Sequence, residues 1–166
     1  MTRVAKYLVA AMLFGGIAWA ADKPEAEIRV RVIQATNTGK KFDPHLEDLR
    51  KFLGQHKFSS FKQVIDETIS VKEEETKGIG LLSGKNLNVT LKSLTRQKAT
   101  IQLLLLGQAG QILDTTVAAG PHKLFFIAGP KYEEGVLFIA IEPHYDPDKL
   151  GPGDVGAKPP DAPKKP

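Results

Sequence analysis

Alternating apolar and polar positions recur along most of the chain, and this period of two predicts β-strands. At 28–32 the polar positions are two arginines, and at 87–92 they are Asn, Thr and Lys. Further strands are expected at 61–71, 97–106, 111–118, 123–128 and 135–141, and glycines at 78, 80 and 84 are interpreted as turns. Turns at this spacing are typical of an antiparallel sheet or a sandwich and not of alternating strand–helix units.

One helix is predicted at 43–54. Asp43 is a suitable N-cap, and Pro44 suits the first helical position because a missing N–H has no helical partner there. Gly54 ends the segment. The apolar side chains recur at helical spacing on one face: Leu46, Leu49, Phe52 and Leu53. We therefore expect an α+β fold that is mostly β, an antiparallel sheet or sandwich with this one helix packed on a sheet face.

Three of the expected strands contain apolar runs without a polar face, at 103–106, 124–128 and 136–141. A strand in a two-sheet sandwich buries one face, whereas an entirely apolar strand needs cover on both. The single helix can cover only part of one sheet. Either the helix and the loops together cover all three runs, or the uncovered part is a contact surface for a partner or for a second copy of the chain.

The beginning of the chain has the features of a signal peptide. Arg3 and Lys6 precede an uncharged run at 7–21, and Ala18 and Ala20 provide the small side chains that a signal peptidase requires. This run is shorter than the roughly 20 apolar residues that span a bilayer. We expect cleavage after Ala20, no integral membrane span in the cleaved protein, and a periplasmic or extracellular location in a bacterium.

The end of the chain is rich in Pro and Gly. Such a segment lacks the backbone donors and apolar side chains that a folded core needs. The expected organisation is a signal peptide at 1–20, a lead-in at 21–26, a single β-rich domain at 27–143 and a disordered tail at 144–166.

Composition and charge exclude several kinds of function. The 166 residues include 23 Lys and Arg against 19 Asp and Glu, and so small an excess does not indicate nucleic-acid binding. The chain has no cysteine, which excludes disulfides, thiolate metal ligands and a cysteine nucleophile.

No motif for catalysis, cofactor binding or metal binding is evident. The histidines His45, His56, His122 and His144 show neither H-E-x-x-H nor H-x-H spacing, so no metal site is predicted. The segment 146–151 begins like a calcium loop but lacks the later ligands, and we interpret it as a turn. We therefore expect no catalytic residue and no cofactor.

Two similar turns lie nine residues apart, Gly-Pro-His-Lys at 120–123 and Gly-Pro-Lys-Tyr at 129–132. If both turns lie at one end of the sheet, they form a small cationic and aromatic patch. The candidate partner-binding residues are His122, Lys123, Lys131 and Tyr132. The alternative is that these are two ordinary turns.

Several short motifs resemble small exported β-rich proteins of bacteria. They are Phe42-Asp43-Pro44 with Leu46 and Leu49, Phe58-Ser59-Ser60-Phe61, Gly129-Pro130, Glu134-Gly135-Val136-Leu137 and Ile139-Ala140-Ile141. The resemblance implies one compact domain and brings no active site with it.

The favoured function is a non-catalytic envelope protein, an adaptor or accessory subunit. It would bind another envelope protein or a second copy of itself, for example by strand addition at an open sheet edge. The alternative is a periplasmic carrier that holds an apolar ligand between helix and sheet, lined by 103–106 and 125–126. A hydrolase is the third and least favoured hypothesis. No acid–base pair or nucleophile can be assembled from neighbours in sequence.

Overall fold

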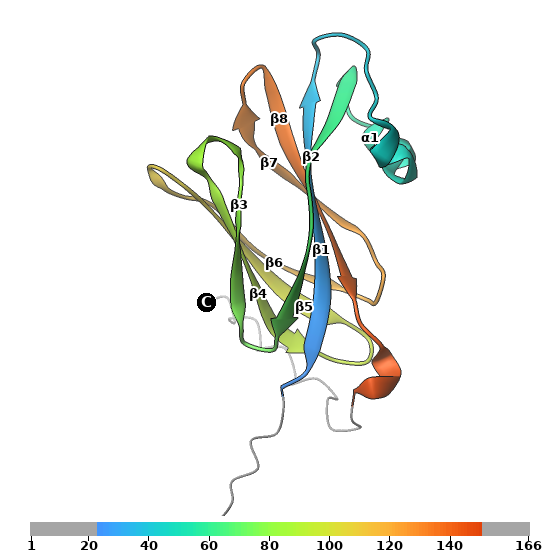
Figure 1. The fold of residues 1–166 in the computed structure, drawn as a ribbon, viewed down its shortest axis with the longest axis vertical. Helices are drawn as coiled ribbons and strands as arrows, with labels where there is room; N and C mark the ends of the chain where they lie inside the picture. Colours follow the sequence, from blue (N-terminus) through green and yellow to red (C-terminus); the bar gives the residue numbers. More distant parts are fainter. Residues whose placement is uncertain (1–22, 151–166) are drawn as a thin grey trace, which may run out of the picture.

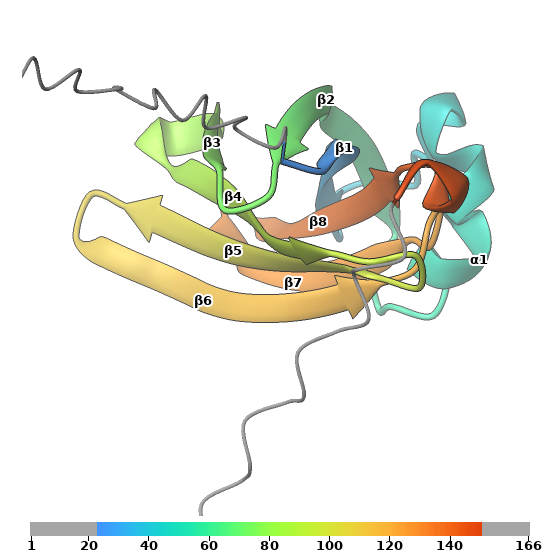
Figure 2. The ribbon, with the colours of Figure 1, turned by 90° about the horizontal axis from the view of Figure 1, so that it is seen from below.

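Two antiparallel four-stranded sheets stack face to face (Figures 1 and 2) in the computed structural model, which describes residues 23–150. Sheet 1 has the strand order β2-β1-β8-β7 and sheet 2 the order β3-β4-β5-β6. The strands are β1 (Glu25–Thr36), β2 (Ser60–Lys72), β3 (Thr76–Gly80), β4 (Asn86–Leu94), β5 (Ala99–Gly107), β6 (Gly110–Ala119), β7 (Phe125–Tyr132) and β8 (Gly135–His144). The predicted α+β, mostly β fold is confirmed, and of the two forms considered it is the sandwich.

The chain crosses between the two sheets twice. A turn at 73–75 leads from β2 to β3, and the loop at 120–124 returns from β6 to β7. Strand β8 then pairs with β7 on one side and with β1 on the other. The first and last strands are therefore neighbours in the middle of sheet 1.

The main core lies between the sheets and explains the alternating pattern. Ile28, Val30 and Val32 of β1 are fully buried there, as are Leu103 and Leu105 of β5. Their alternate neighbours point to the outer faces because successive side chains of a strand lie on opposite sides. One strand was not expected: β3 contains Gly78 and Gly80, which a reading of local sequence assigns to turns, yet these residues pair with Asn88 and Asn86 of β4.

A second apolar cluster lies on the outer face of sheet 1, under the helical segment. Ile33 and Phe138 from the sheet pack against Leu46, Leu49 and Leu53. The predicted helix begins as a 3-10 helix, η1 (Pro44–Leu49), and continues as a single turn of α-helix, α1 (Arg50–Leu53). The three-residue spacing from Leu46 to Leu49 matches the three residues per turn of a 3-10 helix, so both side chains face the sheet.

The predicted ends of the helical segment are confirmed. The Asp43 side chain accepts a hydrogen bond from the backbone N–H of His45 at 3.0 Å, and Pro44 occupies the first turn. Gly54 is the C-cap, and its N–H bonds to the carbonyl of Arg50.

The three apolar runs differ in how far they are buried. The run at 136–141 lies mostly in the middle of sheet 1 and is covered by the main core on one face and by the helical segment on the other. In the run at 103–106, Leu104 and Leu106 remain half-buried on the outer face of sheet 2. In the run at 124–128, Leu124 and Phe125 are 37% and 36% exposed. The main core and the helical segment together bury residues 137–141 of one run, whereas the other two runs keep exposed or half-buried apolar side chains.

The folded body extends further than composition predicts. Strand β8 ends at His144, and a short 3-10 helix, η3 (Pro147–Lys149), follows it. Tyr145 and Leu150 join the main core, so the boundary expected at 143 lies too early. The Pro-rich composition of this segment does not indicate that these two apolar side chains are buried.

Residues 1–22 and 151–166 lie outside the described part of the chain, and with them the expected signal peptide and the rest of the expected tail. Within 23–150, no helix has the length and apolar character needed to cross a bilayer.

Candidate functional site

The four candidate partner-binding residues lie in two separate places. His122 and Lys123 belong to the loop before β7, whereas Lys131 and Tyr132 are the last two residues of that strand. An extended chain rises about 3.3 Å per residue, so Lys123 and Lys131 lie roughly 25 Å apart. The structure therefore does not gather the four side chains into one patch.

His122 instead meets His144 at the end of β8. Their ring centroids lie 4.8 Å apart and the planes are nearly perpendicular, at 85°. The backbone N–H of His122 donates a hydrogen bond to the carbonyl of Pro143 at 2.8 Å. His122 has a φ of 57°, a left-handed conformation that histidine adopts more readily than most residues. The loop is thus held against β8 in one orientation.

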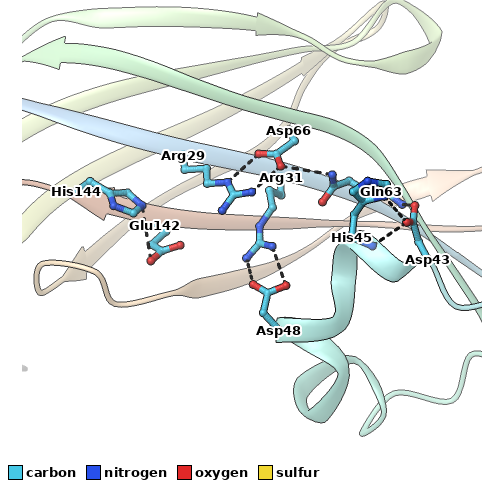
Figure 3. Close-up of polar contacts among 9 residues, drawn as sticks. All are labelled: Arg29, Arg31, Asp43, His45, Asp48, Gln63, Asp66, Glu142 and His144. Carbon is cyan, nitrogen blue, oxygen red and sulfur yellow. Dashed lines mark hydrogen bonds and ion pairs between the residues drawn. The ribbon is translucent and has the colours of Figure 1, made fainter.

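Glu142 completes the group. Glu142 and His144 are two residues apart on β8, so both side chains point to the outer face of sheet 1. The Oε1 atom of Glu142 lies 3.6 Å from Nε2 of His144 (Figure 3). One ligand atom from each of His122, Glu142 and His144 lies within 4.8 Å of the other two. These three side chains could together hold a metal ion.

Arg29 lies opposite Glu142 in the strand register but binds elsewhere. Its guanidinium donates two hydrogen bonds to the Asp66 carboxylate on β2, at 2.8 and 2.6 Å (Figure 3). The hydrogen bond to Asp66 raises the pKa of Arg29 and lowers that of Asp66. Arg29 therefore gives its side-chain hydrogen bonds to Asp66, while its charge also attracts Glu142, whose Oε1 atom lies beside His144.

Arg31 marks the border between this charged half of the sheet face and the apolar half under the helical segment. It is 3% exposed, and its guanidinium donates to both carboxylate oxygens of Asp48 in η1, at 3.1 and 2.8 Å. These hydrogen bonds lower the pKa of the Asp48 carboxyl group. The pair fixes the helical segment on the sheet.

The other two histidines have structural neighbours. His45 Nδ1 lies 2.9 Å from the Asp43 carboxylate, and the hydrogen bond that this carboxylate accepts from the backbone N–H of His45 lowers the pKa of Asp43. The ring of His56 lies 4.6 Å from that of Phe138 in the outer cluster. The expected turn at 146–151 contains η3, where Asp146 accepts a hydrogen bond from the N–H of Asp148.

An open groove of 660 Å³ runs beside the two histidines. It lies between the start of β1, the end of β2 and the segment that follows β8. Glu27 of β1 lies opposite His144 in the register and lines this groove together with Glu25. The groove therefore gives His122 and His144 access to solvent next to two further carboxylates.

A motif search along the sequence missed this group because its members come from two segments. The available signal was the E-x-H pattern of Glu142 and His144 on a predicted outer strand face, together with a histidine just before the preceding strand. In an antiparallel pair, the residue before one strand lies next to the residue after the other. Phe125 pairs with Ile141, and continuing that register brings His122 opposite His144.

The structure also separates the residues expected to line a carrier pocket. Leu103 and Leu105 lie in the main core between the sheets, whereas Phe126 lies in the outer cluster, stacked on Phe52 with centroids 3.6 Å apart. The helical segment contacts the second set, so a pocket between helix and sheet does not include both.

Comparisons with protein-family models, with curated proteins and with solved structures give no match to this chain.

Proposed function

We propose that the protein is a non-catalytic exported protein that binds an extended segment of another envelope protein along the free edge of β7. The observation that carries this proposal is the uncharged stretch at 124–128, which begins with two exposed side chains, Leu124 just before the edge strand β7 and Phe125 as its first residue. Edge strands offer unpaired N–H and C=O groups to a further strand.

The other edges of the sandwich are better protected against strand addition. Charged side chains and short length both discourage it. The β3 edge has five residues, of which two are glycine, and β6 carries Asp114 in its middle. The β2 edge bears a series of charged residues: Lys62, Asp66, Glu67 and Lys72. Strand β7 has its protecting features only in its second half, where Gly129 and Pro130 interrupt the register and Lys131 adds a charge.

The chemistry of β7 indicates what the partner segment carries. Apolar side chains of an added strand would lie beside Leu124 and Phe125 at the exposed start of β7. Lys123 and Lys131 lie at the two ends of this stretch and are exposed, so acidic residues flanking the apolar segment would be favoured. The partner is therefore expected to present a short extended apolar sequence between acidic residues.

Charged substitutions on the edge test this proposal. Leu124→Lys and Phe125→Lys place a charge on the edge at positions that are already partly exposed, so the core is retained. Ile112→Lys is the matched control, because Ile112 is an apolar residue, 44% exposed, on β6 of the other sheet. Each variant is cross-linked in the cell envelope, and amide hydrogen exchange of β7 is measured with the captured partner.

The parent and Ile112→Lys are expected to give the same cross-linked partner, with slower exchange in β7, and the two edge variants are expected to lose it. Retention of the partner by Leu124→Lys and Phe125→Lys would contradict the proposal. Export is part of the same proposal, and a purified protein that begins at Ala21 would support it.

A further inference from the structure

We propose that His122, Glu142 and His144 form a binding site for one divalent transition-metal ion of the zinc type, with a coordination position left open to the groove. The three ligands are different residues from Leu124 and Phe125 of the proposed partner-binding edge, although His122 lies on the loop that leads into β7.

The spacing of the ligand atoms is close to what zinc needs. Zinc bonds to nitrogen and oxygen ligands are about 2.0–2.1 Å long, which puts tetrahedral ligand atoms about 3.3 Å apart. The Glu142 Oε1 and His144 Nε2 atoms are already 3.6 Å apart. His122 is exposed, and the largest separation in the group is no more than 4.8 Å, so a change in its side-chain rotamer brings the third ligand into range.

The surroundings favour a cation at this position. Nε2 of His144 is buried and forms no hydrogen bond with a protein group. Glu142 Oε1, at 3.6 Å, is too far for a hydrogen bond, and a buried ring nitrogen without a hydrogen bond is costly, so a metal bond would satisfy it. Two cations lie near the site: Arg29, which is attracted by Glu142 but gives its hydrogen bonds to Asp66, and Lys149, which lies 3.9 Å from Asp146. Glu25 and Glu27 add negative charge to the groove.

The ligand types select the class of ion. Two imidazoles and one carboxylate suit Zn²⁺, Cu²⁺, Ni²⁺ and Co²⁺, whereas Mg²⁺ and Ca²⁺ prefer ligand sets made only of oxygen. Three protein ligands leave a fourth position for water or for a group supplied from the groove. Among the same ligands, Cu²⁺ is expected to bind more tightly than Zn²⁺.

The site also has a structural consequence. His122 lies on the loop that carries the chain from sheet 2 back to sheet 1, and the other two ligands lie on the central strand β8. A bound ion would therefore connect the crossover loop to the middle of sheet 1, a cross-link that this cysteine-free chain cannot obtain from a disulfide.

Metal titration of the purified protein tests the proposal. We expect one Co²⁺ ion per chain by visible absorption, displaced by Zn²⁺, and a rise in melting temperature with Zn²⁺ that EDTA reverses. Mutation of even the outer partners of metal ligands weakens binding about 10–100-fold, so His122→Asn and His144→Gln are each expected to weaken Zn²⁺ binding at least tenfold. His122→Asn keeps a residue that tolerates the left-handed backbone and lies on an exposed loop, so the fold is retained.

Two further variants complete the experiment. Glu142→Gln is expected to weaken Zn²⁺ binding while keeping the shape of the side chain. His45→Gln is the matched control, because His45 is an exposed histidine on the helical segment, outside the site, and its affinity for Zn²⁺ should equal that of the parent. Unchanged affinity in both His122→Asn and His144→Gln would overturn the proposal. So would equal loss in His45→Gln, or saturation by Ca²⁺ or Mg²⁺ in place of Zn²⁺.

Discussion

The buried guanidinium of Arg31 donates hydrogen bonds to both carboxylate oxygens of Asp48, and this pair joins strand β1 to the helical segment. The two partners differ in environment: the side chain of Arg31 is 3% exposed and that of Asp48 is 57% exposed. The side-chain hydrogen bonds of this buried charge thus go to the helical segment, while Asp66 lies opposite Arg31 on β2 and adds a second negative charge nearby.

Asp48→Asn is expected to destabilise the protein. The substitution leaves the Arg31 charge buried and only partly compensated, which in a fully buried pair costs about 3–5 kcal/mol. Solvent screening at Asp48 reduces this to about 1–2 kcal/mol in the free energy of unfolding, measured by urea denaturation. Glu47→Gln is the control, since the Glu47–Arg50 pair lies on the exposed side of the same segment, and it should leave the urea midpoint nearly unchanged. Equal losses in the two variants would mean that burial of Arg31 is unimportant.

Stability is expected to fall in acid, from about pH 4 downward. Hydrogen bonds from Arg31 and Arg29 lower the pKa of Asp48 and Asp66, respectively, below the ordinary value of 3.8. The unfolded chain therefore binds protons on these groups before the folded chain does, so their stabilisation is present above the unfolded pKa and is lost as pH falls through the lower folded values.

Urea denaturation at a series of pH values from about 6 to about 2 measures this loss. Asp66→Asn removes one of the two carboxyl groups and should make the acid loss shallower. A pH dependence that is equally steep in this variant would show that other carboxyl groups control acid unfolding.

Tyr145→Phe is expected to be neutral or stabilising by up to about 1 kcal/mol. The ring of Tyr145 lies in the main core, and its hydroxyl is buried without a hydrogen-bond partner in the protein. Removal of that hydroxyl removes a desolvated polar group while keeping the ring. Thermal unfolding measures the change, and a clear loss of stability would indicate that the hydroxyl bonds to an ordered water molecule.

Gly135→Ala is expected to cost about 1–3 kcal/mol by overpacking. A methyl group at Gly135, the first residue of β8, would overlap the backbone carbonyl of Ala35 on β1, which has no room to move inside the sheet. Gly80→Ala on the β3 edge is the matched control, because no atom lies within 4 Å of a methyl group there. The two urea midpoints should differ clearly, and equal midpoints would mean that β1 and β8 can separate locally at this end.

Local sequence signals were sufficient where one residue determines the structure of its own segment. Asp43 and Pro44 begin the helical segment, Gly54 ends it, and Arg29 and Arg31 point away from the main core, all as the pattern predicts. The signals failed for β3, because Gly78 and Gly80 take their strand conformation from pairing with β4 and not from any preference of their own.

The E-x-H pattern of Glu142 and His144 is visible in the sequence, but the approach of His122 to it is not, because that approach depends on register. The register between β7 and β8 shifts between Ala128 and Lys131, where Gly129 and Pro130 lie. Without that shift, the residue opposite His122 would be Tyr145 and not His144. This one-residue shift in the middle of the hairpin thus places His122 opposite His144. The residues at the two ends of the hairpin do not indicate the shift.

The pairing of β1 with β8 has a consequence for how the protein reaches its native state. Sheet 1 lacks β8, one of its two central strands, until residues near 144 are available. A chain that is synthesised or translocated from its N-terminus therefore cannot complete the sandwich before its last strand is present. Contacts between such distant segments also slow folding. A chain of this topology therefore completes sheet 1 only after its last strand, β8, is available.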